Sequence, residues 1–150
     1  MVTALPLPAD KGNSDVIYVA QTVYGEARGE PWNAKLGVAN VILNRKKAKR
    51  RYFGRSIKTV VQKPQQFSCW NYSDVNRSKI HNPLKYGSVD TWLECYVAAR
   101  LVLTGKVIDN TRGALWYIDD TIIDHPPSWV AKLKLCARHG RLYFFREKSV

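Results

Sequence analysis

The stretch TVYGEARGEPWNAKLGVANVILNR, which runs from Thr22 to Arg45, decides how this chain folds. Its first part places two glutamates, Glu26 and Glu30, among glycines and a proline, which are residues that interrupt helices. Its second part predicts a helix from about Pro31 that is apolar on nearly every face, with Ala34 to Leu43 as the buried segment. Such a helix lies at the centre of a domain. We therefore expect both glutamates beside the core and not on a remote loop.

The residues around the glutamates predict a break between two helices. Ser14 is a good N-cap for the first helix, and Gly29 is suited to end it. Pro31 disfavours the helical conformation for the residue before it and suits the first position of a new helix. Glu26 is thus expected in the last turn of the first helix, and Glu30 at the start of the second.

The rest of the chain predicts an α+β domain over residues 14–150, preceded by a flexible segment, 1–13. A third helix is predicted from its N-cap Ser88 to Thr104. Its core side is expected to carry Val89, Trp92, Leu93, Tyr96, Val97 and Leu103. Short segments rich in aromatic and aliphatic residues, Gly113–Ile118 and Leu142–Phe145, predict strands, the second of them in a terminal hairpin. Helices followed by a small antiparallel sheet define the α+β class.

The charge balance is the outlier of the composition. Lys and Arg total 24 against 12 for Asp and Glu, which gives a net charge of +12, and cations crowd residues 45–58. A basic surface attracts polyanions such as nucleic acid, anionic lipid or an anionic polymer, and charge alone does not choose among them. We expect the 45–58 cluster to be a solvated face.

Other features of the composition exclude several classes of protein. A hydrophobic content of 45% with 11% aromatics indicates a folded protein and not a disordered one. No segment is long and apolar enough to span a membrane, and the N-terminal residues lack the pattern of a signal peptide. The three cysteines form no C-x-x-C pair, and the three histidines share no ligand spacing with them. We expect no metal site and no cofactor.

Glu26 is a candidate general acid. A carboxyl group at a helix end, beside a buried helix and among aromatic residues, meets the low polarity that raises carboxyl pKa values and retains a proton. Glycosidases protonate a leaving-group oxygen with such a group. The alternative is a structural role in which Glu26 caps a helix or pairs with Arg28, and spacing alone favours that alternative.

Four motifs in a fixed order carry a resemblance to a known family. They are VYGEARGEPWNAKLGVANVILNR (residues 23–45), QQFSCWN (65–71), GALWY (113–117) and PPSWV (126–130). They resemble the cell wall hydrolase family named for the spore cortex-lytic enzymes, which also has phage-encoded members. The resemblance covers roughly residues 14–146. The first motif is the most specific, and the second strengthens it at the expected distance.

The resemblance implies a lysozyme-like fold and a catalytic domain that cleaves peptidoglycan glycan strands between N-acetylmuramic acid and N-acetylglucosamine. It implies lytic transglycosylase chemistry, which forms 1,6-anhydro-muramyl ends with one glutamate as the acid. By its position in the motif, that residue is Glu26, with Glu30 and Arg28 in support. Synthesis is then expected in the cytoplasm without a signal peptide, and action at the wall follows release or occurs as a virion component.

Further residues are expected along the substrate groove. Gln66, Phe67 and Ser68 would supply contacts beside the sugars, while the candidates to stack on them are Trp70, Trp116, Tyr117 and Trp129. Core packing is the alternative for the aromatics, equally for Tyr117 and more so for Trp129. The chain departs from the family at Leu142, where histidine is common, and at Leu115 and Trp116.

Other functions stay open at this stage. A muramidase would hydrolyse the same bond with a second carboxylate, for which the candidates are Glu30, Asp74, Asp119, Asp120 and Asp124. The chain offers no convincing second acid, which favours the transglycosylase. A basic nucleic-acid-binding module would explain the charge, yet no recognition motif is present. An amidase would need zinc ligands, and a noncatalytic wall-binding module would not need Glu26. We expect a monomer that acts on glycan strands and has no specific nucleic-acid partner.

Overall fold

The structure is a computed structural model of the chain, and it describes residues 13–64 and 66–148. Nearly all of the predicted flexible segment, 1–13, lies outside the described residues. The helical part contains α1 (Asn13–Ala27), α2 (Trp32–Ala48), α3 (Ile57–Gln62), the 3₁₀ helix η1 (Ser68–Trp70), α4 (Asn76–His81), α5 (Pro83–Tyr86) and α6 (Val89–Leu103). The remainder contains β1 (Trp116–Asp119), the 3₁₀ helix η2 (Ser128–Lys132), β2 (Leu133–His139) and β3 (Leu142–Glu147). The predicted α+β class is confirmed.

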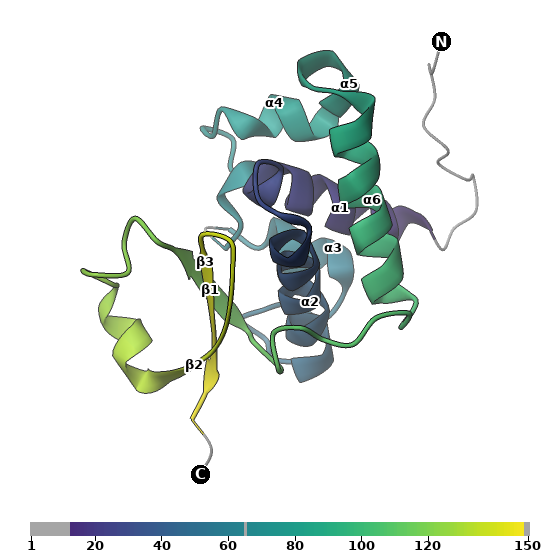
Figure 1. Cartoon of the computed structure of the whole chain (residues 1–150). Coiled ribbons are helices and arrows are strands. Elements are labelled where there is room, and N and C mark those ends of the chain that lie inside the picture. Colours follow the sequence, from purple (N-terminus) through teal and green to yellow (C-terminus); the bar gives the residue numbers. More distant parts are fainter. Residues whose placement is uncertain (1–12, 65, 149–150) are drawn as a thin grey trace.

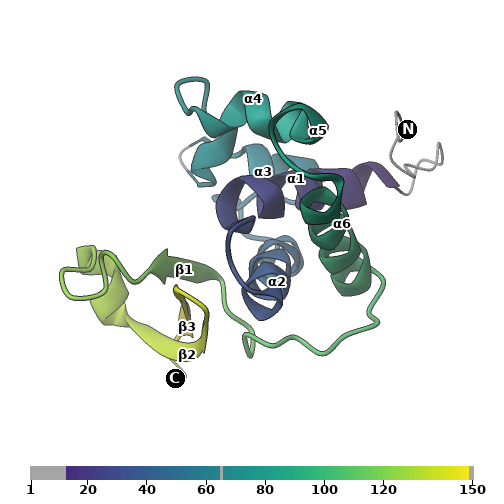
Figure 2. The ribbon, with the colours of Figure 1, turned by 45° about the horizontal axis from the view of Figure 1, so that its top comes forward.

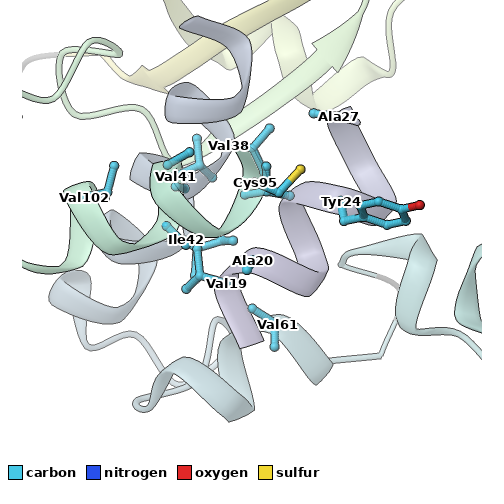
Figure 3. Packing of buried hydrophobic residues seen from close by; sticks show 14 of the residues in the cluster. Val19, Ala20, Tyr24, Ala27, Val38, Val41, Ile42, Val61, Cys95 and Val102 are labelled. Atoms are coloured by element: carbon cyan, nitrogen blue, oxygen red, sulfur yellow. The ribbon is translucent and has the colours of Figure 1, made fainter. Parts of the chain in front are cut away.

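Helix α2 is the centre of the molecule. Figure 2 shows it almost end-on, with α1, α3 and α6 around it and the sheet on its remaining side. Every residue from Ala34 to Ile42 is buried, and Leu43 is half-buried. The prediction of a buried central helix is therefore confirmed. Figure 3 shows Val38, Val41 and Ile42 of this helix packed among side chains from α1, α3 and α6.

Buried and half-buried polar residues of α2 have hydrogen-bond partners within the helix or in neighbouring segments. The Lys35 ammonium donates to the Glu30 carbonyl (2.7 Å) and to Glu94 Oε1 on α6 (3.1 Å). Asn40 Nδ2 donates to the Leu36 carbonyl (3.0 Å), and Asn44 Nδ2 donates to Asp109 Oδ2 (2.8 Å). A buried polar group costs little when it is hydrogen-bonded, so these residues do not oppose burial of the helix.

Strand β3 is the middle strand of a three-stranded antiparallel sheet with the order β1-β3-β2. The sheet lies between the helices and the segment that contains η2 (Figure 1). Phe144 faces α2, where a Cβ on Gly37 would lie 2.5 Å from its ring, so only glycine permits this contact. Phe145 faces the other way and packs with Ile118 and Val130. The predicted terminal hairpin is confirmed as β2 and β3.

Helix α6 corrects one expectation. Ser88 caps it as predicted, because its side chain accepts a hydrogen bond from the Thr91 backbone N–H. Val97, however, is 43% exposed and does not belong to the core side. It lies five residues beyond the buried Trp92, which is about 140° around a helix of 3.6 residues per turn. Within the described residues, none of the helices is long and apolar enough to cross a membrane.

Burial of α2 generates a prediction about stability. Val38→Asp places an unpaired carboxylate in the core, and we expect it to lower the free energy of unfolding by more than about 3 kcal/mol. Val97→Asp is the matched control, because it introduces the same group at an exposed helix position and should change stability by less than about 1 kcal/mol. Thermal and denaturant unfolding measure both. Equal melting of the Val38 variant and the wild type would contradict the central position of α2.

Candidate active site

The Glu26 carboxylate accepts hydrogen bonds from two distant segments of the chain. It projects from the last turn of α1, as the sequence predicts. Tyr117 Oη, on β1, donates to Oε1 over 2.7 Å. The backbone N–H of Cys69 and the hydroxyl of Ser68, both on η1, donate to Oε2 over 3.3 Å and 3.4 Å. Three donors on two sides hold the carboxylate in one orientation.

Gly25 allows η1 to approach the end of α1. A Cβ on Gly25 would lie 2.5 Å from Cys69 Cβ and 2.8 Å from Ile80 Cγ2, distances that side chains do not adopt. Because residue 25 is a glycine, η1 packs directly against the helix, and the N–H of Cys69 comes within reach of Glu26. The glycine before the glutamate thus serves close packing, in addition to any effect on the length of the helix.

Tyr117 reaches Glu26 because of the alternation of side chains along β1. Tyr117 and Asp119 point toward the helices, while Trp116 and Ile118 point toward the cluster on the other face. Burial raises the pKa of Tyr117 well above its usual value, and the nearby Glu26 carboxylate raises it further. The residue therefore remains a phenol, which can donate to Glu26.

Arg45 places a buried positive charge near this pair. Its Nε donates to the Leu115 carbonyl (2.7 Å) and its Nη1 to Gln66 Oε1 (3.2 Å). The guanidinium also stacks on the rings of Phe53 and Phe67, at 4.8 Å and 5.0 Å. Burial lowers the pKa of Arg45 to about 10, so the group is still charged at neutral pH. Arg45 is consequently not part of a solvated face, which corrects the expectation for the first residue of the 45–58 cluster.

Two surface hollows meet at Glu26. One, of about 430 Å³, is lined by Gly25, Glu26, Ser68, Tyr117, Ile118, Asp119, Ile122, Pro127, Trp129 and Leu142. The other, of about 320 Å³, is lined by Gly25, Glu26, Ala27, Arg28, Gly29, Glu30 and Asn76. Both have the size of ligand sites, and they share Gly25 and Glu26. A chain-like ligand that occupied both would pass directly over the Glu26 carboxylate.

Glu30 and Arg28 both hold the ends of structural segments. Glu30 Oε1 accepts a hydrogen bond from the backbone N–H of Arg141 (2.9 Å) in the β2–β3 turn. Arg28 Nη2 donates to Asn76 Oδ1 (2.8 Å) at the start of α4, and Nη1 donates to the Tyr24 carbonyl (3.1 Å). Glu30 thus joins the sheet to the helices, and Arg28 joins α1 to α4. Neither has a direct hydrogen bond to Glu26 among the described residues.

The predicted groove residues separate into two groups. Ser68 and Tyr117 line the hollow of about 430 Å³ that also contains Asp119, and both bind Glu26 directly. Phe67 is buried below them, with its ring 6.5 Å from that of Tyr117, and Gln66 is exposed and bound to Arg45.

Two predicted stacking residues do not reach either hollow of Glu26. The indole Nε1 of Trp70 donates to Thr22 Oγ1 (2.8 Å), and its ring packs against Tyr18. Trp116 contacts Phe53, with 5.6 Å between ring centroids, on the face of β1 opposite to Tyr117. Adjacent residues on a strand face opposite ways, so Trp116 is turned away from Glu26 when Tyr117 binds it.

Trp129 differs from its expected place in the core. Core packing is the interpretation favoured by the sequence, yet its side chain is 42% exposed and lines the same hollow as Glu26. Ile122 and Pro127 line that hollow too, and the sequence contains no signal that singles them out. Arg45 is also missed as a site residue, because its place in a run of cations suggests a surface position.

The other candidate carboxylates have separate environments. Asp119 shares one hollow with Glu26, as Glu30 shares the other, and Asp119 Oδ1 accepts hydrogen bonds from the backbone and hydroxyl of Thr121. Asp74 Oδ1 accepts from the Asn76 N–H (2.8 Å), and Asp120 forms an ion pair with Arg141 (3.1 Å). Within residues 13–64 and 66–148, no group of three or more His, Cys, Asp or Glu side chains is arranged to hold a metal ion.

Comparison with known proteins identifies the family of the chain. The model of the cell wall hydrolase family matches residues 29–145. A spore cortex-lytic enzyme of Bacillus subtilis (strain 168) is 40% identical over 66 residues, which cover 44% of this chain and 21% of that enzyme. The chain thus spans about a fifth of the length of this relative.

Two solved structures share the fold. The catalytic domain of the germination-specific lytic transglycosylase SleB from Bacillus anthracis has a TM-score of 0.64 and 24% identity, over 93% of this chain and 99% of that one. The catalytic domain of the Bacillus cereus SleB protein has a TM-score of 0.65 and 24% identity, over 97% and 100%. The solved structures show the fold, and the family match over most of its length shows that the chain belongs to the cell wall hydrolase family.

Proposed function

We propose that the protein cleaves the glycan strands of peptidoglycan between N-acetylmuramic acid and N-acetylglucosamine, as a lytic transglycosylase. The observation that carries the proposal is the position of the Glu26 carboxylate, held by Tyr117 and η1 at the junction of two hollows. A glycan strand that extends through both hollows presents one glycosidic oxygen to this carboxylate. The proposal is supported by a relative in sequence that is named a spore cortex-lytic enzyme and by a structure of the same fold that is named a lytic transglycosylase.

Glu26 can perform both proton transfers of the reaction. As a carboxylic acid it protonates the glycosidic oxygen, and the bond from that oxygen to the anomeric carbon of the muramyl residue breaks. The 6-hydroxyl of the same muramyl residue then attacks the anomeric carbon and gives its proton to the Glu26 carboxylate. The product is a 1,6-anhydro ring, and the acid is regenerated. Tyr117 and Ser68 carry hydroxyl groups, which can donate or accept and so match both forms of Glu26.

A hydrolytic muramidase is the second candidate function, and Asp119 is the observation that favours it. Two-carboxylate glycosidases place both acids around the scissile bond, and Asp119 lies in the same hollow as Glu26. Glu30 lies in the other hollow of Glu26 but is bound to the hairpin backbone, and Asp120 is paired with Arg141. One Asp119 oxygen is bound to Thr121, which ties this carboxylate to its own turn and favours the transglycosylase.

Replacement of Glu26 tests the site. Glu26→Gln keeps the shape of the side chain and an acceptor oxygen for Tyr117, but it removes the proton that is transferred. We expect the protein to fold and its turnover of purified peptidoglycan to fall by ~10²–10⁴-fold, the usual contribution of a general acid. Release of soluble glycan fragments measures the loss.

Glu30→Gln is the matched control for that experiment. Its amide oxygen can still accept the hydrogen bond from the Arg141 N–H, so the hairpin should stay in place and the loss of activity should be far smaller. Near-normal turnover in Glu26→Gln would contradict the assignment of the acid. An equal loss in both variants would indicate that the charge of the whole turn matters and not Glu26 itself.

The chemistry of the product separates the two candidate functions. Digestion in heavy-oxygen water should give 1,6-anhydro-muramyl ends without label, because no water enters the cleaved bond. Mass spectrometry of the fragments identifies these ends. Labelled reducing ends, together with loss of activity in Asp119→Asn, would establish the hydrolytic muramidase instead.

We further propose that the basic cluster binds the anionic cell envelope. Lys46, Lys47, Lys49 and Arg55 surround Leu43 at a hollow of about 440 Å³ near the C-terminal end of α2, and no carboxylate lines it. Cations at the end of a helix also interact favourably with its dipole, so folding tolerates this concentration of charge. The cluster therefore offers a positive surface to phosphate- or carboxylate-bearing polymers, in addition to the contact with glycan.

Charge reversal tests the role of this surface. Changing Lys46, Lys47 and Lys49 to Glu should weaken the sedimentation of the protein with isolated envelopes, because the attraction to the anionic polymer is lost. The remaining binding should depend less on salt, since exposed charges are screened over ~8 Å at physiological salt. Turnover of short soluble glycans should change less. The control reverses Lys85, Arg100 and Lys106, which are exposed residues of or beside α5 and α6, with the same change in net charge. Equal envelope binding by the two triple variants would refute a specific basic surface.

A further inference from the structure

The connection between β1 and β2 brings an apolar surface to the hollow that contains Glu26. Ile122 and Trp129 are 39% and 42% exposed, and both line this hollow together with Pro127. A single exposed hydrophobic side chain needs no explanation, but two that meet at a half-buried proline beside a candidate catalytic carboxylate indicate a binding surface. The sheet side of Glu26 therefore has an apolar wall.

The backbone that carries Trp129 is anchored on both sides. Its neighbour Val130 is buried with Ile118 and Phe145 on the outer face of the sheet. The Val130 N–H donates to the Pro127 carbonyl (3.0 Å), which closes the first turn of η2. Consecutive residues of this turn point in different directions, so burial of Val130 directs Trp129 outward. The indole is thus presented to solvent from a fixed position, which lowers the entropic cost of binding.

The two hollows at Glu26 differ in chemistry. The hollow on the helix side is lined by Arg28, Glu30 and Asn76 and contains no aromatic residue. The hollow on the sheet side combines the exposed Trp129 with the Ser68 hydroxyl and the Asp119 carboxylate. A pyranose ring has apolar faces of C–H groups and a rim of hydroxyl and amide groups. Only the sheet-side hollow offers a flat apolar surface together with polar groups at its edge.

We propose that Trp129 is the stacking platform for one N-acetylated pyranose ring of the glycan strand, on the sheet side of Glu26. The inference rests on the proposed function and names a residue that binds the sugar at that site. Ser68 and Asp119 accompany the platform as hydrogen-bonding partners for the rim of the ring. Trp129 contributes to substrate affinity and takes no part in the proton transfers.

Binding measurements in an inactive background test the platform. The probe is short glycan strands purified from peptidoglycan after removal of the stem peptides, added to the Glu26→Gln protein. Trp129→Ala should raise the Kd about tenfold or more, because a large apolar contact is lost, while Trp129→Phe should retain part of the affinity. Quenching or a blue shift of tryptophan fluorescence on binding should be lost with Trp129→Ala.

Trp32→Ala is the matched control. Trp32 is 36% exposed, close to the value for Trp129, and it lines neither hollow at Glu26. This variant should retain the affinity and the fluorescence change of the parent protein. Unfolding curves of all variants verify that the segment around η2 is intact, and Trp129→Phe preserves a ring there if the alanine variant melts early.

Kinetics in the Glu26 wild-type background separate failure of the platform from failure of the proposed function. We expect Trp129→Ala to raise KM on glycan strands with a much smaller change in kcat. Unchanged KM and Kd in a protein that cleaves glycan normally would overturn the platform alone. No cleavage and no binding of glycan strands by the parent protein would overturn the proposed function, and the platform with it.

Discussion

Burial of helix α2 is the constraint on which the rest of the structure depends. Its apolar surface is covered by α1, α3, α6 and the sheet, so its few polar side chains must find partners inside the protein. Asn44 binds the connection that leads from α6 to the sheet, and Arg45 binds the Leu115 carbonyl just before β1. The satisfaction of buried polar groups therefore determines where β1 begins. That position in turn brings Tyr117 to Glu26.

The candidate site is a consequence of this packing. Glu26 comes from α1, its backbone donor Cys69 is 43 residues away, and its phenolic donor Tyr117 is 91 residues away. The buried charge of Arg45 lies near Glu26 and Tyr117, and its guanidinium stacks on Phe53 and Phe67. The acid is thus mounted on a helix whose other side is part of the core. A rigid support of this kind keeps a catalytic group in its productive orientation.

Sequence reasoning succeeds where the chemistry is local. The break between the helices around Glu26 and the terminal hairpin follow from glycine and proline positions and the periodicity of apolar residues. The end residues are less exact, because α1 begins at Asn13, before the expected N-cap Ser14, and Pro31 precedes the first residue of α2. Sequence reasoning fails where two segments meet. Trp70 and Trp116 are aromatic residues of the type that stacks on sugars. Trp70 nevertheless packs on α1, and Trp116 lies on the face of β1 opposite to Tyr117. Trp129 is the same residue type, and it is exposed because its neighbour Val130 is the residue that packs into the core.

The sequence by itself determined the α+β class, the buried central helix and the place of Glu26 at a helix end, because these depend on residues within a few turns of each other. Only the tertiary structure decided which groups surround Glu26. Tyr117, Arg45 and Asp119 were all visible in the sequence, but their roles depend on which face of a strand or helix meets which neighbour. That choice is made by close packing, as at Gly25 and Gly37, where the absence of a side chain lets distant segments come into contact.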